Sequence, residues 1–277
     1  MKKQVKSWAA FGAVFAAATG AQAMGTVEPL GMPTQIFVMA QAHQHAANAG
    51  EAGEAGEAGE SGGQQDMDLA VDDANFIAIL GEVEGHLRAA YELYRLGAVD
   101  LSKTHVKHPK DELYADLLPV FEKRGLKGFD AELVQMAALI ESGAKAEDVL
   151  AALNATVVAI DENSASLRTA KTTVEAVHLV ARTAAAEYKI GVEAGNIKDP
   201  HEFQDAWGFT ETAKRLMAAL SETERAVNAG AVNTIIAQLE SLAPAWNDLT
   251  GASGTNVEAN VLAATAARIE IAALSVK

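Results

Sequence analysis

The spacing of apolar residues constrains this chain most, because it is helical from Leu69 almost to the C-terminus. Between Asp72 and Gly97 apolar side chains recur every three or four residues, the period of an amphipathic α-helix. Asp72 suits an N-cap and Gly97 suits a helix stop. The sequence has no alternating β-branched run of strand length, and alanine is abundant. We therefore predict an all-α fold, a helical bundle.

Proline and capping patterns place further helices. Pro109 is expected to open a helix ending at Gly125, after a loop that carries His105 and His108. Shorter helices are expected over roughly 129–142 and 145–160, and a long one over about 164–194.

Three later helix starts carry capping signals. Asp199 is expected to cap a helix that has Pro200 at its first position. The pairs Ser221 with Glu224 and Thr255 with Glu258 predict two more capped starts.

A faint internal repeat indicates two halves, 70–160 and 163–277. In each half a helix ends in glutamate plus an aromatic residue, a glycine-containing loop follows, and proline opens an acidic helix. We expect either one bundle or two bundle halves side by side.

The N-terminus, residues 1–23, has the three parts of a secretory signal peptide. Lys2, Lys3 and Lys6 supply positive charge, and the apolar stretch 8–19 is shorter than the roughly 20 residues that span a bilayer. Ala21-Gln22-Ala23 provides the small residues that signal peptidase recognises. We predict cleavage after Ala23, a periplasmic location and no stable membrane insertion after cleavage.

Residues 24–69 are predicted to be a disordered linker. Repeated Gly-Glu-Ala triplets over 50–60 have little apolar surface to bury. His43 and His45 precede this tract, and together with its carboxylates they could capture divalent ions weakly. The alternative is a spacer with two incidental histidines.

Charge and cysteine content exclude several classes of function. The chain carries 22 basic and 37 acidic residues, a formal charge of −15, which argues against nucleic acid and anionic membrane surfaces as partners. It has no cysteine, which excludes disulfides, thiolate nucleophiles and cysteine-ligated metals. Metal cations remain compatible partners, and no complete catalytic motif is present, so we do not expect an enzyme.

Two histidine-containing clusters stand in the first half. Glu82 and His86 are four residues apart and share one helix face, so carboxylate and imidazole would converge if that face is buried. His105 and His108 precede an acidic helix start. The structural alternatives are a boundary histidine paired with Glu82 and a histidine that caps a helix.

A third cluster lies in the second half. From it we select Glu187 as the best additional ligand. Phe203 and Phe209 are expected in the core, and His178 is expected to be a core histidine. The other polar members of this cluster are Tyr188, Glu193, Asp199, His201, Glu202, Gln204 and Asp205.

Three segments carry a family resemblance. GHLRAAYELYRLG (85–97), HVKHPKDELYADLLPVFEKRG (105–125) and EYKIGVEAGNIKDPHEFQDAWGFTETA (187–213) resemble the helical periplasmic domain associated with bacterial high-affinity iron permeases and, more distantly, imelysin-like periplasmic proteins. The resemblance implies an exported helical domain linked to iron or a related cation. The chain lacks permease membrane segments and the His-x-x-Glu pair of imelysin-type proteins, because Asp111 follows His108 at that spacing.

The sequence thus leads to a periplasmic metal-binding or metal-delivery protein. Its predicted metal ligands are Glu82, His86, His105, His108 and Glu187. Iron is the expected ion, with copper and zinc as alternatives that suit imidazole ligands. An inner-membrane permease or another periplasmic protein is the expected partner. The competing hypothesis is a helical interaction or scaffold protein with no metal, which predicts that His86, His105 and His108 lie far apart.

Overall fold

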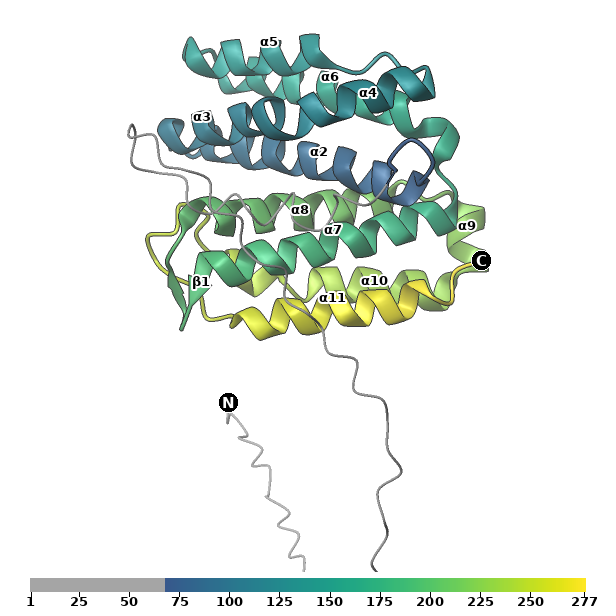
Figure 1. Ribbon diagram of the computed structural model, residues 1–277. Helices are drawn as coiled ribbons and strands as arrows, with labels where there is room; N and C mark the ends of the chain where they lie inside the picture. Colours follow the sequence, from purple (N-terminus) through teal and green to yellow (C-terminus); the bar gives the residue numbers. More distant parts are fainter. Residues whose placement is uncertain (1–67) are drawn as a thin grey trace, which may run out of the picture. The chain divides into compact units, whose positions relative to one another are not determined.

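The computed structural model describes residues 68–277, apart from the side chain of Glu112, and confirms the all-α prediction (Figure 1). The predicted signal peptide, almost all of the predicted linker and the pair His43 and His45 lie outside the described residues. The α-helices are α2 (Asp73–Arg95), α3 (Val99–His108), α4 (Ala115–Arg124), α5 (Asp130–Glu141), α6 (Ala146–Ser164), α7 (Ala170–Gly191), α8 (Pro200–Ala218), α9 (Glu222–Val227), α10 (Ala229–Glu240) and α11 (Ala259–Ala273). Short elements are the π-helix η1 (Pro109–Tyr114), the 3₁₀ turns η2 (Ala165–Leu167) and η3 (Ala243–Trp246), and the two-residue strands β1 (Val192–Glu193) and β2 (Asn196–Ile197).

The first helix, α2, runs through the middle of the described body. Asp72 caps it by accepting from the backbone N–H of Asn75, as predicted, and Gly97 follows its end with φ 81°. Both glutamates Glu82 and Glu84 are buried together with the apolar positions, because α2 packs against α3 and α6 on one side and α7 and α8 on the other. A buried charged residue needs a partner, so α2 must carry paired polar groups.

The prediction of a loop before Pro109 is wrong. His105 and His108 lie on α3, and the chain stays helical across Pro109 as the π-helix η1 before continuing as α4. Proline has no N–H for the ladder, and a π turn with its wider hydrogen-bond pattern is one way to accommodate that loss. The two histidines therefore occupy fixed helical positions, one turn apart.

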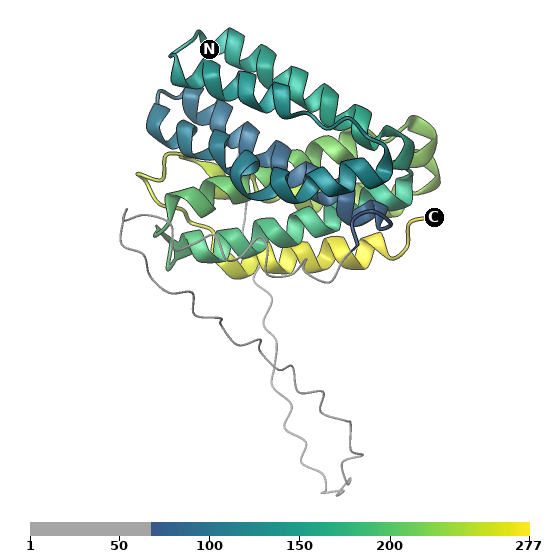
Figure 2. The ribbon, with the colours of Figure 1, turned by 45° about the horizontal axis from the view of Figure 1, so that its top comes forward.

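The helices form layers around two apolar clusters. Helices α7, α8, α10 and α11 surround a cluster that contains Tyr188, Phe203 and Phe209, and α2 to α6 surround another that contains Phe76 and Leu117. Figures 1 and 2 both show α11 beside α7, and α5 and α6 on the far side of α3 and α4. The clusters separate close to the boundary between the predicted halves, and α2 contributes to both. That each half is a separate structural unit stays a prediction.

The long helix predicted over 164–194 is shorter at both ends. It begins at Ala170, capped by Thr169, and its last residue is Gly191. Residues 192–197 form a two-stranded antiparallel hairpin in which Ala194 and Gly195 both have positive φ, 50° and 77°. Positive φ at both central residues is typical of the tight turns that join hairpin strands.

The capping predictions are confirmed at two helices and wrong at a third. Asp199 accepts from the N–H of His201 at the start of α8, and Ser221 and Glu224 form a reciprocal capping box at α9. Thr255 does not cap α11, whose N-cap residue is Glu258. The Thr255 hydroxyl instead pairs with the buried Tyr188 hydroxyl at 3.0 Å, so tertiary packing overrides the local signal.

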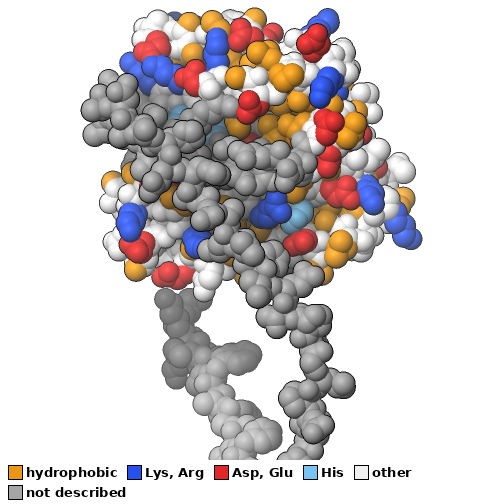
Figure 3. Space-filling model, in the orientation of Figure 1, with side chains coloured by type: hydrophobic (Ala, Val, Ile, Leu, Met, Phe, Trp, Pro, Cys, Tyr) orange, Lys and Arg blue, Asp and Glu red, His pale blue; other side chains and the backbone are white. Residues whose placement is uncertain are grey.

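The described surface carries mixed charge. In Figure 3, the parts of the visible face not drawn in grey show acidic and basic side chains side by side. Among residues 68–277, none of the helices is both long and apolar enough to cross a membrane.

A candidate metal centre

The site begins with the close crossing of α2 and α8. A Cβ atom added at Gly208 would overlap the carbonyl oxygen of Gly85, and one added at Gly85 would overlap the ring of Phe209. Only glycine at both positions allows this approach. His86 follows Gly85 directly and Asp205 stands one turn before Gly208, so the crossing brings these two side chains together.

Four of the five histidines in residues 68–277 gather at this crossing. The His86 ring lies 6.4 Å from the His105 ring and 5.8 Å from the His108 ring, measured between centroids. His201 on α8 stacks on His105 at 4.2 Å and lies 4.3 Å from His108. We call these four histidines and Asp205 the histidine cluster.

Asp205 is the carboxylate of the histidine cluster and is almost fully buried. Its Oδ1 lies 2.7 Å from Nδ1 of His86 and 2.9 Å from Nδ1 of His105, and its Oδ2 lies 3.4 Å from Nδ1 of His201. Within residues 68–277, Oδ1 of Asp205 and Nδ1 of His105 have no partner aligned as a hydrogen bond. The atoms converge as ligands of a shared ion would.

Gln204 fixes which nitrogen of His105 carries the proton. Its Nε2 lies 3.0 Å from the backbone carbonyl oxygen of Leu249, which only accepts, so the amide nitrogen must occupy that side. Its Oε1 therefore faces Nε2 of His105 at 2.8 Å, and that nitrogen must donate. A neutral His105 then directs the lone pair of Nδ1 at Asp205, and two facing lone pairs repel unless a positive charge stands between them.

The pKa shifts indicate an ionised carboxylate beside a neutral imidazole. Burial alone would raise the pKa of Asp205, but His86 and His105 outweigh it and hold that pKa well below the usual range. Burial lowers the pKa of His201 to about 3, against the opposing effect of Asp205, and the neighbouring histidines lower it further. Neutral imidazoles are the form that binds metal.

Two groups of three side chains have the reach to hold a metal ion. One is His86, His105 and Asp205; the other is His201, Glu202 and Asp205. Within each group the ligand atoms lie within 4.8 Å of one another, and Asp205 belongs to both. A set of imidazole nitrogens with one or two carboxylate oxygens suits iron, copper, zinc or nickel better than magnesium or calcium. The donors therefore fit a first-row transition ion.

The structure brings together three of the five predicted ligands. His86, His105 and His108 all belong to the cluster. Among the described residues, His108 falls in neither three-ligand group, and the same is true of Glu82 and Glu187. Glu82 instead accepts a hydrogen bond of 2.8 Å from the hydroxyl of Thr183 on α7, and Glu187 is buried one turn further along that helix. Their ligand role stays a prediction.

Sequence reasoning did not select His201 and Asp205, although both stand in the polar segment that opens α8. The usable signal was their spacing of four residues, which puts an imidazole and a carboxylate on one helix face. Gln204, their neighbour, carried no signal, because its role depends on the distant carbonyl of Leu249.

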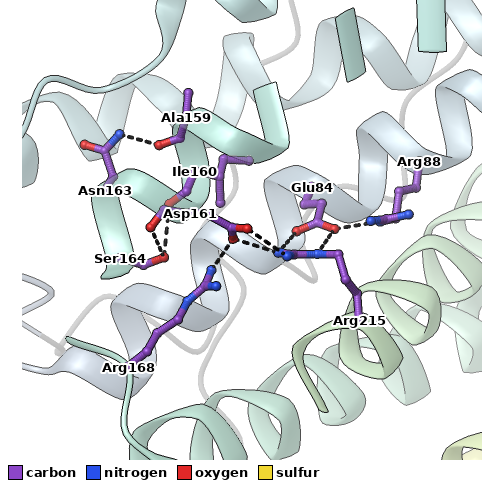
Figure 4. Close-up of polar contacts among 9 residues, drawn as sticks. All are labelled: Glu84, Arg88, Ala159, Ile160, Asp161, Asn163, Ser164, Arg168 and Arg215. Atoms are coloured by element: carbon purple, nitrogen blue, oxygen red, sulfur yellow. Dashed lines mark hydrogen bonds and ion pairs between the residues drawn. The ribbon is translucent and has the colours of Figure 1, made fainter. Parts of the chain in front are cut away.

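A second buried polar group flanks Gly85 on its other side. Glu84 is fully buried and accepts from Arg88 at 2.6 Å and, with both oxygens, from Arg215 on α8 (Figure 4). Arg215 also contacts Asp161 on α6 at 3.1 Å, and Asp161 accepts from Arg168 at 2.5 Å. We call these five residues the arginine cluster.

Comparison with known proteins gives one family. Residues 163–274, from the end of α6 through α11, match the model of the iron permease-associated 4-helix bundle domain. No curated protein and no solved structure matches the chain.

Proposed function

We propose, from the iron permease-associated 4-helix bundle domain at residues 163–274 and the buried histidine cluster, that this protein is a periplasmic metal-binding protein that handles iron. The metal ligands are His86, His105 and Asp205, supported by His108 and His201. In this proposal the iron is cargo, and an inner-membrane permease or another exported protein receives it.

The observation that carries the proposal is the approach of two imidazole nitrogens to one carboxylate oxygen. Oδ1 of Asp205 faces Nδ1 of His86 and Nδ1 of His105, and Gln204 holds the only proton of neutral His105 on the opposite nitrogen. Protonating both imidazoles would place two buried cations against one carboxylate, which is costly. One divalent ion supplies the positive charge that all three atoms face.

The competing scaffold hypothesis predicts different distances between the histidines. It requires the first-half histidines to lie well apart, whereas their ring centroids are 5.8 and 6.4 Å from that of His86. Nothing in a scaffold role would call for three buried imidazoles and a partly buried one gathered at one carboxylate. We therefore keep metal binding as the proposed function.

Affinity alone does not identify the ion, because copper binds most nitrogen sites more tightly than iron does. The natural cargo is therefore tested by metal analysis of untagged protein isolated from the periplasm. We expect iron, with about one or two ions per chain; a chain isolated with zinc or copper alone would overturn iron while leaving metal binding intact.

The site is tested by calorimetric titration with ferrous iron under anaerobic conditions, and with copper and zinc. We expect uptake at micromolar concentration by the wild type and the loss of at least one bound ion in the double variant His86→Ala, His105→Ala. His178→Ala, a histidine outside the cluster, is the matched control and should bind as the wild type does. Circular dichroism checks that each variant keeps its helical content. A wild type that takes up none of the three metals contradicts the proposal, and wild-type binding by the double variant contradicts the site.

A further inference from the structure

The two carboxylate oxygens of Asp205 face different partners. Oδ1 points to His86 and His105, at 2.7 and 2.9 Å, and Oδ2 points to His201, at 3.4 Å. His86, His105 and Asp205 form one group of three ligand atoms within 4.8 Å of one another. His201, Glu202 and Asp205 form the other, so Asp205 belongs to both. A carboxylate that belongs to two such groups is placed to bridge two cations, as in the carboxylate-bridged centres of other helical bundles.

The two groups differ in their access to solvent. The side chains of His86 and His105 are 0% exposed, whereas that of His201 is 20% exposed. We call the first group the inner position and the second the outer position. His108 lies between them, with its ring 5.8 Å from that of His86 and 4.3 Å from that of His201.

The outer position also has its own charge. Glu202 and Asp205 stand three residues apart on α8, and both are almost fully buried. His201 offers its other nitrogen as well, since Nε2 is buried and has no hydrogen-bond partner within residues 68–277. A bound cation is electrostatically favourable beside a buried carboxylate, so Glu202 gives the outer position a ligand charge besides that of Asp205.

We propose that the histidine cluster binds two divalent first-row metal ions, one at the inner and one at the outer position, with Asp205 shared between them. This inference rests on the proposed function and extends it. It states how many ions the site binds and which of the two positions exchanges its ion with the surroundings. The outer position exchanges ions with solvent or a partner protein, and the inner position holds an ion out of water.

The experiment counts the ions bound by the exported full chain. Wild-type protein and Glu202→Gln are titrated with zinc and copper, and bound metal is measured after gel filtration. We expect two ions per chain for the wild type and one for Glu202→Gln, because the amide keeps the volume and removes the ligand charge. Glu211→Gln, on the same helix but in a partly exposed pair with Lys214, is the control and should keep two.

A second ion could also be held by His43 and His45, so each protein is measured with both of these replaced by alanine. Copper electron paramagnetic resonance gives an independent readout. Two copper ions that share a carboxylate couple magnetically, so the wild type should show a coupled signal that is absent in Glu202→Gln and in His201→Asn.

The outcomes separate this inference from the proposed function. One ion in both the wild type and Glu202→Gln, without coupling, overturns the second position and leaves metal binding intact. Two ions in both proteins, after the removal of His43 and His45, also overturn the assignment to Glu202. No ion in the wild type overturns the proposed function itself. If Glu202→Gln does not fold, His201→Asn and the coupled signal of the wild type decide the question.

Discussion

The histidine cluster and the arginine cluster share two helices but pair their charges differently. The first adds the histidines of α3, and the second adds Asp161 of α6 and Arg168. Both join α2 to α8, and they start from the two neighbours of Gly85, Glu84 and His86, which point roughly 200° apart around the helix. In the arginine cluster, permanent cations meet the buried carboxylate of Glu84 and the carboxylate of Asp161 directly (Figure 4). In the histidine cluster, titratable imidazoles surround one ionised carboxylate.

This difference in charge pairing suits the arginine cluster to a structural role and the histidine cluster to the proposed metal binding. Arginine stays protonated at any physiological pH, so the arginine cluster is complete without a further ion. In the proposed function the imidazoles bind in their neutral form, and a metal cation from outside completes the histidine cluster. Buried polar groups next to each other on one helix can therefore serve structure and ligand binding separately.

Removing the central carboxylate of each cluster should give the largest difference in stability between the two clusters. Glu84→Ala leaves Arg215 and Arg88 without their buried partner, and breaking a buried ion pair costs about 3–5 kcal/mol. Asp205→Asn in the metal-free protein should cost less, because the amide keeps the volume and no permanent cation loses its partner. Urea unfolding of both variants without metal measures the two free energies. The comparison fails if Asp205→Asn is the more destabilising change.

Gln204 offers the next largest effect, on metal affinity rather than on folding. Gln204→Leu frees His105 to carry its proton on Nδ1, where it would donate to Asp205 and compete with the metal. Loss of such a supporting hydrogen bond typically costs 10–100-fold in metal affinity. Competition titration measures the affinity, and the nitrogen chemical shifts of His105 report its tautomer.

Gln204→Glu is the matched variant for that test. It keeps an acceptor facing Nε2 of His105, so the tautomer should return. Its second oxygen replaces the N–H that donates to the carbonyl oxygen of Leu249, so the affinity should recover only in part. A Gln204→Leu protein that binds metal like the wild type, with its tautomer unchanged, would show that the position only fills space.

The smallest effect is expected from Glu82→Gln and Glu187→Gln. Neither carboxylate belongs to a three-ligand group in residues 68–277, so each acts on the ion only as a more distant charge. We expect unchanged stoichiometry and less than about a tenfold loss of affinity, which corresponds to 1.4 kcal/mol. Calorimetric titration measures both quantities. Loss of a whole ion in either variant would restore these glutamates as ligands.

Sequence patterns predict the helices well and the site only in part. The periodic residues of α2 and the caps Asp72, Asp199 and Ser221 are local signals, and the structure confirms them. The histidines of α3 were predicted as ligands but placed in a loop. A proline inside a helix is rare, and the π turn that accommodates it leaves no clear trace in sequence.

The second-half ligands depend on information that no single segment contains. His201 and Asp205 lie near the other histidines because α8 turns that face toward α2, and this orientation follows from the crossing at Gly85 and Gly208. Glu187 was an equally plausible ligand from the sequence of the same polar cluster, but it lies on α7. The packing of helices that are far apart in the sequence decides which acidic helix face lies near the histidines.

The glycine crossing also offers a way to tune which ion the site prefers. The backbones of α2 and α8 touch at Gly85 and Gly208, and the contact stands beside His86 and one turn from Asp205. Whatever sets the separation of the two helices at that point also sets the span between ligands from different helices. A change in the distance between the α2 and α8 backbones at this contact could thus change ion selectivity without a change in any ligand. Since both positions are already glycine, a larger residue there could only move the helices apart, so positions 85 and 208 are where a designer would widen the site.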